Sequence, residues 1–147
     1  MRNLKMILEF DGSRYKGWQK QPNNELTVEG KIESSLCKMV GEIIEVEGCT
    51  RTDVGVHAQN YVANFHTECD LSLEAIMDYL NGDLPDDIVV KSVAFASEKF
   101  NSGYNIKSIT YVYRISNSEL RNVFNRKYVY NSEGLLNLEE MRNTAEY

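Results

Sequence analysis

The order in which two apolar periodicities follow one another constrains this chain more than any other feature. Alternation with a period of two predicts four strands, at residues 4–10, 43–48, 60–67 and 88–95. Apolar stripes with helical spacing predict a helix between Thr27 and Gly41 and a shorter one after Ser72. The resulting β-α-β-β-α-β order predicts an α+β fold with a ferredoxin-like antiparallel sheet. Two helices then cover one face of the sheet, and RNA-binding domains of this plan use the free face.

The pattern continues with extra C-terminal elements. Residues 109–116 alternate and predict a further strand that carries Tyr111 and Tyr113 on one face. Two such tyrosines either pack in a core or form a platform on which a nucleic-acid base stacks. A short strand is predicted at 128–130, followed by a helix that Asn137 caps. The apolar stripe of this helix runs on to the last residues, which favours a truncated helix over a frayed natural terminus.

Charge is distributed unevenly along the chain. The net charge is −6 and the pI is near 5.0, which alone argues against nucleic-acid binding because phosphate contacts need a basic surface. Residues 68–98 hold a single basic residue, Lys91, among many acids, whereas residues 99–130 hold six basic residues against one acid, Glu119. A protein with such a split can present a basic face, although a mixed solvated surface fits the same composition.

The sequence shows no sign of a membrane segment or an oxidising compartment. No apolar run approaches the ~20 residues needed to span a bilayer, and the first ten residues lack the apolar core of a signal peptide. Three irregularly spaced cysteines are typical of reduced thiols, so we expect a cytoplasmic protein. The cysteines and the two histidines have no zinc-binding spacing, and we expect no metal site.

One short segment has the composition of a catalytic loop. The sequence RTDVGVHA, residues 51–58, lies between the second and third predicted strands. Arg51 stands two residues before Asp53, and a guanidinium near a carboxylate keeps it ionised as a nucleophile or a base. Gly55 permits a sharp turn or the close approach of a substrate. Each residue taken singly is more typical of an ordinary turn.

The same segment resembles the active-site sequence of the TruA family of tRNA pseudouridine synthases, in which Arg-Thr-Asp is followed by a small residue and Gly-Val-His. Further segments resemble that family in the same order, namely FDGSRYKGWQKQP, TVEGKIESSL, YLNGDLPDDI, KSITYVYRI and LNLEEMR. The resemblance covers essentially the whole chain. It implies that residues 1–147 form the N-terminal catalytic domain of an enzyme whose second domain is absent from this chain.

The resemblance also implies an activity, the isomerisation of uridine to pseudouridine in the anticodon arm of tRNA, without a cofactor. The target uridine leaves its stack, its C1′–N1 bond breaks, and C5 of the uracil is joined to C1′. A carboxylate beside the sugar either attacks C1′ or removes the C2′ proton. The full-length protein is expected to be a homodimer, because the tRNA arm and the modified site would span two subunits.

By the same resemblance, Asp53 is the catalytic carboxylate, and Arg51 pairs with it and fills the space of the flipped base. Tyr111, the first of the Tyr-x-Tyr pair, stacks on the uracil. Further candidates for substrate binding are Arg14, Lys16, Trp18, Lys20, Thr52, His57 and Lys107. For the loop 14–20, phosphate contact and a solvated loop with Trp18 anchored in the core fit the sequence about equally well.

Three other interpretations stay open at this stage. The chain could be a truncated product that folds without turnover, a plain RNA-binding module that uses the sheet and Tyr111, or an acidic scaffold that binds protein. The combination of Asp53 with Arg51 favours chemistry over the plain RNA-binding module. A steep salt dependence of tRNA binding would separate an RNA-binding protein from the scaffold.

Overall fold

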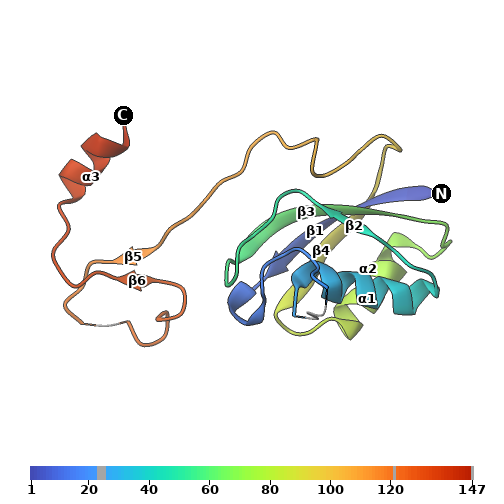
Figure 1. Ribbon diagram of the computed structural model, residues 1–147, viewed down its shortest axis with the longest axis horizontal. Coiled ribbons are helices and arrows are strands. Elements are labelled where there is room, and N and C mark those ends of the chain that lie inside the picture. Colours follow the sequence, from blue (N-terminus) through green and yellow to red (C-terminus); the bar gives the residue numbers. More distant parts are fainter. Residues whose placement is uncertain (23–25, 121, 147) are drawn as a thin grey trace. The chain divides into compact units, whose positions relative to one another are not determined.

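A computed structural model describes residues 1–22, 26–120 and 122–146 (Figure 1). Residues 23–25, Arg121, which is one of the six basic residues in 99–130, and Tyr147 lie outside the described residues. The chain divides into two units, residues 1–107 and 108–147, and each is described by itself. In the described part of the chain the fold is mixed, with an antiparallel four-stranded sheet and three α-helices.

The first unit has the six elements that the sequence predicts, in the predicted order. They are β1 (Arg2–Phe10), α1 (Val28–Val40), β2 (Val46–Gly48), β3 (Ala58–Thr67), α2 (Leu73–Asp83) and β4 (Ile88–Ala96). The strands are antiparallel and lie in the order β2-β3-β1-β4. The second strand is shorter than the predicted 43–48, since the amide of Ile44 donates to the Cys37 sulfur of α1, at 3.3 Å.

Both helices begin at the caps that the sequence predicts, and α1 also ends at its predicted cap, whereas α2 runs on through Gly82 to Asp83. The Thr27 hydroxyl accepts from the Gly30 amide of α1, at 3.3 Å, and the Ser72 hydroxyl accepts from the Ala75 amide of α2, at 3.1 Å. Gly41 ends α1 in the left-handed conformation, with a φ of 76°. Such caps satisfy backbone groups that a helix end would otherwise leave unpaired.

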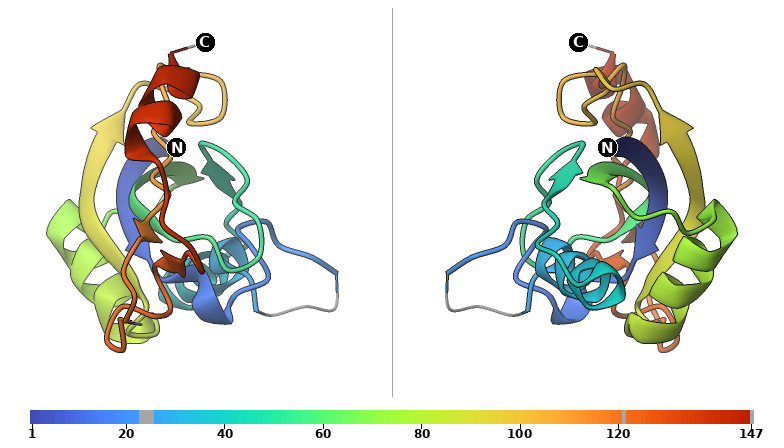
Figure 2. Two further views of the ribbon diagram at one scale, coloured as in Figure 1. Left: turned by 90° about the vertical axis from the view of Figure 1, so that its left-hand side faces the viewer. Right: turned by 90° about the vertical axis from the view of Figure 1, so that its right-hand side faces the viewer.

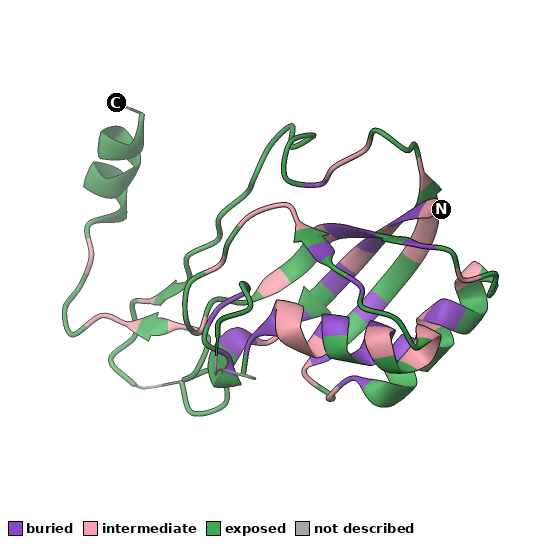
Figure 3. Cartoon of the chain, turned by 45° about the vertical axis from the view of Figure 1, so that its right-hand side comes forward, coloured by how far each residue is buried: buried purple, intermediate pink, exposed green. Residues whose placement is uncertain are grey.

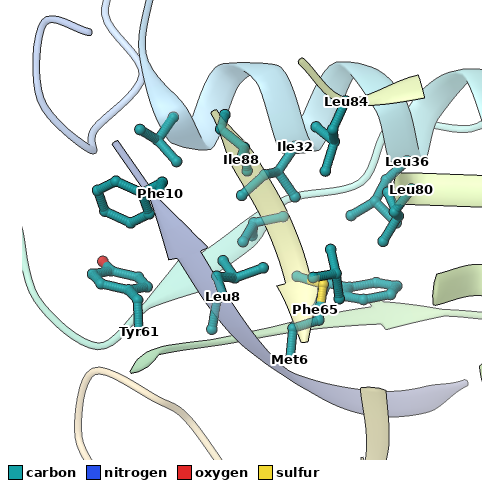
Figure 4. Packing of buried hydrophobic residues seen from close by; sticks show 14 of the residues in the cluster. Met6, Leu8, Phe10, Ile32, Leu36, Tyr61, Phe65, Leu80, Leu84 and Ile88 are labelled. Atoms are coloured by element: carbon teal, nitrogen blue, oxygen red, sulfur yellow. The ribbon is translucent and has the colours of Figure 1, made fainter. Parts of the chain in front are cut away.

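The core lies between the two helices and one face of the sheet (Figures 1 and 2). Alternate residues of β1 and β3 point into it, as the period of two requires. Figure 4 shows these side chains meeting the apolar stripes of the helices, with Met6, Leu8, Phe10, Ile32, Leu36, Tyr61, Phe65 and Leu80 all buried. Burial of this apolar surface is the main force that holds the unit together.

The opposite face of the sheet is partly covered by the chain that follows β4. The Asn3 amide nitrogen donates to the carbonyl oxygens of Ser97 and Phe100, at 2.8 Å each. The Asn64 amide nitrogen donates to the Asn3 carbonyl oxygen at 3.1 Å, while its own oxygen accepts from the Ser102 amide at 2.8 Å. Buried polar groups need hydrogen-bond partners. The two buried asparagines find theirs in residues 97–102 and so hold this segment against the sheet.

The second unit holds a parallel pair of two-residue strands, β5 (Ile115–Ser116) and β6 (Tyr130–Asn131), and the helix α3 (Leu138–Ala145). Asn137 caps α3 as predicted and accepts from the amides of Glu139 and Glu140, at 3.2 Å each. The predicted strand at 109–116 is wrong except for its last two residues. A strand exists only where its backbone pairs with a neighbouring strand. Among the described residues, 109–113 have no such strand partner, and the pairing begins where the Tyr130 amide donates to the Arg114 carbonyl oxygen at 2.9 Å.

Burial separates the two units clearly. Figure 3 shows buried residues throughout the first unit, whereas none of the described residues from 108 to 146 is buried. Large apolar side chains such as Tyr111, Tyr113 and Phe124 are exposed in the second unit. The described helices include none that is long and apolar enough to cross a bilayer.

Candidate functional site

The Asp53 loop, residues 49–57, joins β2 to β3, the position that the sequence predicts. Asp53 and Arg51 are both exposed. A turn closes within the loop, where the amide of Val56 donates to the Asp53 carbonyl oxygen at 3.2 Å. Gly55 occupies this turn with a φ of 79°, a conformation that strongly favours glycine. The turn presents the Asp53 carboxylate to solvent, where a ligand can reach it.

The backbone of the Asp53 loop lies directly on the segment that follows β1. A Cβ atom on Gly12 would be 1.9 Å from the Val56 carbonyl oxygen, and one on Gly17 would be 2.5 Å from the Thr52 carbonyl oxygen. Real Cβ atoms essentially never approach so closely. Both positions require glycine, since only hydrogen in place of a side chain allows the two backbones to touch.

Hydrogen bonds join the same two segments. The Trp18 amide donates to the Thr52 carbonyl oxygen at 3.1 Å. The His57 Nδ1 atom lies 3.1 Å from the Gly12 amide, from which it accepts, and 2.9 Å from an Asp11 carboxylate oxygen. The two contacts suit different protonation states, because Nδ1 accepts from Gly12 when bare and donates to Asp11 when it carries a proton. His57 thus fixes the end of the loop to the end of β1.

A stacked aromatic pair supports the loop from the core. The rings of Trp18 and Tyr61 are stacked, with centroids 4.1 Å apart, and Phe10 lies 5.5 Å from Tyr61. The Tyr61 hydroxyl donates to the Thr50 carbonyl oxygen, immediately before Arg51. Burial raises the pKa of the Tyr61 phenol, so the hydroxyl keeps its proton and can act as this donor at neutral pH.

The structure places Trp18 in the core, only 2% exposed, as one interpretation of the sequence predicts, while phosphate contact by the basic residues of the loop 14–20 stays a prediction. Its indole has little surface left for a ligand. Its Nε1 atom donates to a Glu29 carboxylate oxygen at 3.0 Å, which satisfies the one polar atom of the ring. Trp18 therefore contributes to the site by supporting the loop.

The basic residues of the same segment differ in their partners. The Arg14 guanidinium donates to Asp87 at 2.7 Å, and the Lys20 ammonium lies 2.7 Å from Glu33. Both side chains are still largely exposed, so they keep donors for an anion. Lys16 is exposed beside them, and Lys107 is exposed at the end of the first unit.

The expected pairing of Arg51 with Asp53 is not formed, since among the described residues no ion pair joins the two side chains. Both groups are exposed, and water competes well with an ion pair at a surface. Tyr111 lies in the second unit and is 81% exposed. Within the described part of the chain no cluster of three or more acidic, histidine or cysteine residues could hold a metal ion.

Comparison with known proteins decides which family has this loop. The family model of tRNA pseudouridine synthases matches residues 6–105, which include part of β1, all of β2, β3 and β4, the Asp53 loop and its supporting segment. The chain belongs to the tRNA pseudouridine synthase family. Asp53 and Arg51 lie within the matched range, whereas Lys107 and Tyr111 lie beyond it.

Several curated relatives from this synthase family resemble the chain along its length. It is 58% identical over all 147 residues to tRNA pseudouridine synthase A 1 of Clostridium tetani (strain Massachusetts / E88). It is 44% identical over its whole length to tRNA pseudouridine synthase A 2 of Bacillus cereus (strain ZK / E33L). Identity to tRNA pseudouridine synthase A of Aquifex aeolicus (strain VF5) is 43% over 97% of the chain. The chain spans 60% of the length of the first two relatives and 59% of the third.

Several residues of this synthase-family site were not predicted from its sequence. Tyr61 and Glu29 support the Asp53 loop, but each follows the pattern of an ordinary strand or helix residue. Gly12 also contacts the loop, and its place directly after β1 is typical of a simple turn. Only the neighbours that the fold brings to these positions reveal what they support.

Proposed function

We propose that this chain carries the catalytic carboxylate, Asp53, of an enzyme that isomerises uridine to pseudouridine in the anticodon arm of tRNA. The observation that carries the proposal is the Asp53 turn, which is exposed and yet held by direct backbone contact with residues 12–18. A catalytic group must be both accessible to its substrate and held in place. The names of the curated relatives, which are tRNA pseudouridine synthases, support the choice of substrate.

The proposed reaction is an isomerisation, so no atom enters or leaves overall. The C1′–N1 bond of the uridine breaks, the uracil turns, and a C1′–C5 bond forms. C5 then gives up its proton, and N1 gains one. Asp53 either attacks C1′ and is later displaced, or removes the C2′ proton and later returns it. Neither route requires a cofactor.

The other candidate residues take supporting roles in this proposal. Arg51 fills the space that the flipped uridine leaves and pairs with Asp53 once RNA excludes water, because an ion pair strengthens as the surroundings become less polar. Tyr111 stacks on the uracil, and its hydroxyl is available for the late transfer of the C5 proton. The exposed cations Arg14, Lys16, Lys20 and Lys107 contact phosphates, and Thr52 and His57 line the approach to Asp53.

The proposal extends to the architecture and the assembly. The element order together with the strand order β2-β3-β1-β4 supports the ferredoxin-like plan for the first unit. Residues 1–147 are the N-terminal catalytic domain, and a second domain closes over Asp53. The whole enzyme is a cytoplasmic homodimer, so that one tRNA contacts two subunits.

A chimaera tests the proposal. Residues 1–147 replace the matching part of the Clostridium tetani relative, and the release of tritium from C5-labelled uridine in tRNA is measured. The chimaera is expected to release tritium, and Asp53→Asn is expected to abolish release while tRNA binding and folding persist. Near-normal release by Asp53→Asn would refute the assignment. The 147 residues alone are expected to fold without measurable release, because an open site positions its substrate poorly.

A further inference from the structure

Glu29, in the first turn of α1, holds the segment on which the Asp53 loop lies. One carboxylate oxygen accepts from the Trp18 indole Nε1 at 3.0 Å, and the other accepts from the Lys20 amide at 2.6 Å. The backbone adds further contacts, since the Glu29 amide donates to the Trp18 carbonyl oxygen at 3.0 Å. Two acceptors thus meet two donors, and the chain from Trp18 to Lys20 is fixed to the start of the helix.

Trp18 passes this restraint to the Asp53 loop in two ways. Its amide donates to the Thr52 carbonyl oxygen at 3.1 Å, next to Asp53 in sequence. Its ring stacks on Tyr61, whose hydroxyl donates to the Thr50 carbonyl oxygen. The residues on both sides of Arg51, Thr50 and Thr52, are therefore hydrogen-bonded to the stacked pair, and Asp53 follows Thr52 directly.

We propose that Glu29 is a positioning residue for Asp53, acting through Trp18 without touching the substrate. The inference rests on the proposed catalytic role of Asp53. The Glu29 carboxylate accepts hydrogen bonds from Trp18 and Lys20, while Asp53 is exposed on the loop. A displacement of about 1 Å at a reacting group can lower a rate by roughly 100-fold. Loosening Trp18 would allow such a displacement without unfolding the sheet.

Two N–H groups point at Glu29, so this position favours a side chain that accepts hydrogen bonds. Removal of the carboxylate leaves the indole N–H and the Lys20 N–H without partners next to the core, and both then need water. Burial raises the pKa of Glu29, and the hydrogen bonds from Lys20 and Trp18 oppose that rise. Glutamine keeps one acceptor oxygen in place, so Glu29→Gln should retain one of the two hydrogen bonds. Alanine retains neither.

The test compares kcat and KM in the chimaera described above. Glu29→Ala is expected to lower kcat for tritium release about 10- to 100-fold with KM changed less than about threefold. Glu29→Gln should restore kcat to within about threefold of the parent. Ser72→Ala is the matched control, because it removes the cap of α2 and so lowers stability at a site that does not contact the loop. It should leave kcat unchanged at a temperature where all variants are folded.

Two further measurements keep the outcomes distinct. In the double variant Glu29→Ala with Trp18→Phe, the loss of kcat should be smaller than the product of the single losses, because both changes break one connection. In the 147-residue chain, Glu29→Ala should speed hydrogen exchange at the Trp18 and Thr50 amides, whereas Ser72→Ala should not. An unchanged kcat and unchanged exchange in Glu29→Ala would overturn the inference. Activity in Asp53→Asn would instead refute the proposed function.

Discussion

The Val56 carbonyl oxygen occupies the space in which a side chain on Gly12 would begin, 1.9 Å from the position of a Cβ atom. The Asp53 loop therefore rests on a residue that is 41 positions away in sequence, counted from Gly12 to Asp53. The atoms on both sides of this contact belong to the backbone. A side chain cannot rotate away to relieve the clash, so the loop itself would have to move.

Substitution of Gly12 should accordingly impair the site. Gly12→Ala is expected to lower tritium release by the chimaera at least 10-fold and to cost roughly 1–3 kcal/mol of stability through overpacking. Gly82→Ala is the control, because a Cβ there meets no atom within 4 Å. It should be neutral or slightly stabilising, since it replaces a glycine inside α2. Full activity in Gly12→Ala would show that the loop tolerates displacement.

Substitution of Tyr111 should separate RNA binding from stability. Because Tyr111 is 81% exposed, Tyr111→Ala should change the free energy of unfolding of the chain by less than about 0.5 kcal/mol. In the chimaera it should weaken tRNA binding by roughly 1–3 kcal/mol, the contribution of one stacked base, whereas Tyr111→Phe keeps the stack. Tyr113→Ala, at an equally exposed tyrosine, is the control. Equal losses at both positions would contradict a specific role for Tyr111.

The carboxylate of Asp87 should make stability depend on pH. Burial tends to raise its pKa, but hydrogen bonds from Arg14 and Tyr15 outweigh burial and hold the pKa below its ordinary value. A carboxylate with a lowered pKa contributes stability above its unfolded value of about 3.9, and this contribution is lost as the pH falls through the folded pKa. Asp87→Asn should therefore be less stable at pH 7 and show a flatter loss of stability below about pH 4.

Urea unfolding at a series of pH values checks this expectation. Asp86→Asn serves as the matched control, since Asp86 is the exposed neighbour of Asp87. If Asp87→Asn keeps the same dependence on acid as the parent chain, the carboxylate of Asp87 is not the group responsible.

The buried pair of Asn3 and Asn64 should govern the segment that follows β4. Asn64→Ala removes the acceptor for the Ser102 amide and the donor to Asn3, which should cost roughly 1–3 kcal/mol. Proteolysis should then begin within residues 97–105, a segment that we expect to resist cleavage in the parent chain. Asn60→Ala, at an exposed position of β3, is not expected to open this segment. An unchanged cleavage pattern in Asn64→Ala would mean that other contacts hold the segment.

Local rules determined much of the first unit. The strands and helices follow from apolar spacing, and the caps at Thr27, Gly41 and Ser72 follow from the chemistry of single residues, because these features depend on neighbours within a few positions. The same rules placed RTDVGVHA in the connection between two strands, and similarity to known synthases supplied the family. They failed at 109–114, since a strand depends on a partner that a periodic pattern does not provide.

Tertiary structure alone decided what supports Asp53. Three contacts support it, and no sequence pattern indicates any of them. They join Gly12 to Val56, Glu29 to Trp18 and Tyr61 to Thr50. A glycine after a strand, a glutamate in a first helical turn and a tyrosine on a buried face each have an ordinary local explanation. Their common role follows from the antiparallel pairing of β1 with β3, which brings the last residue of β1 beside the first residue of β3, next to the loop.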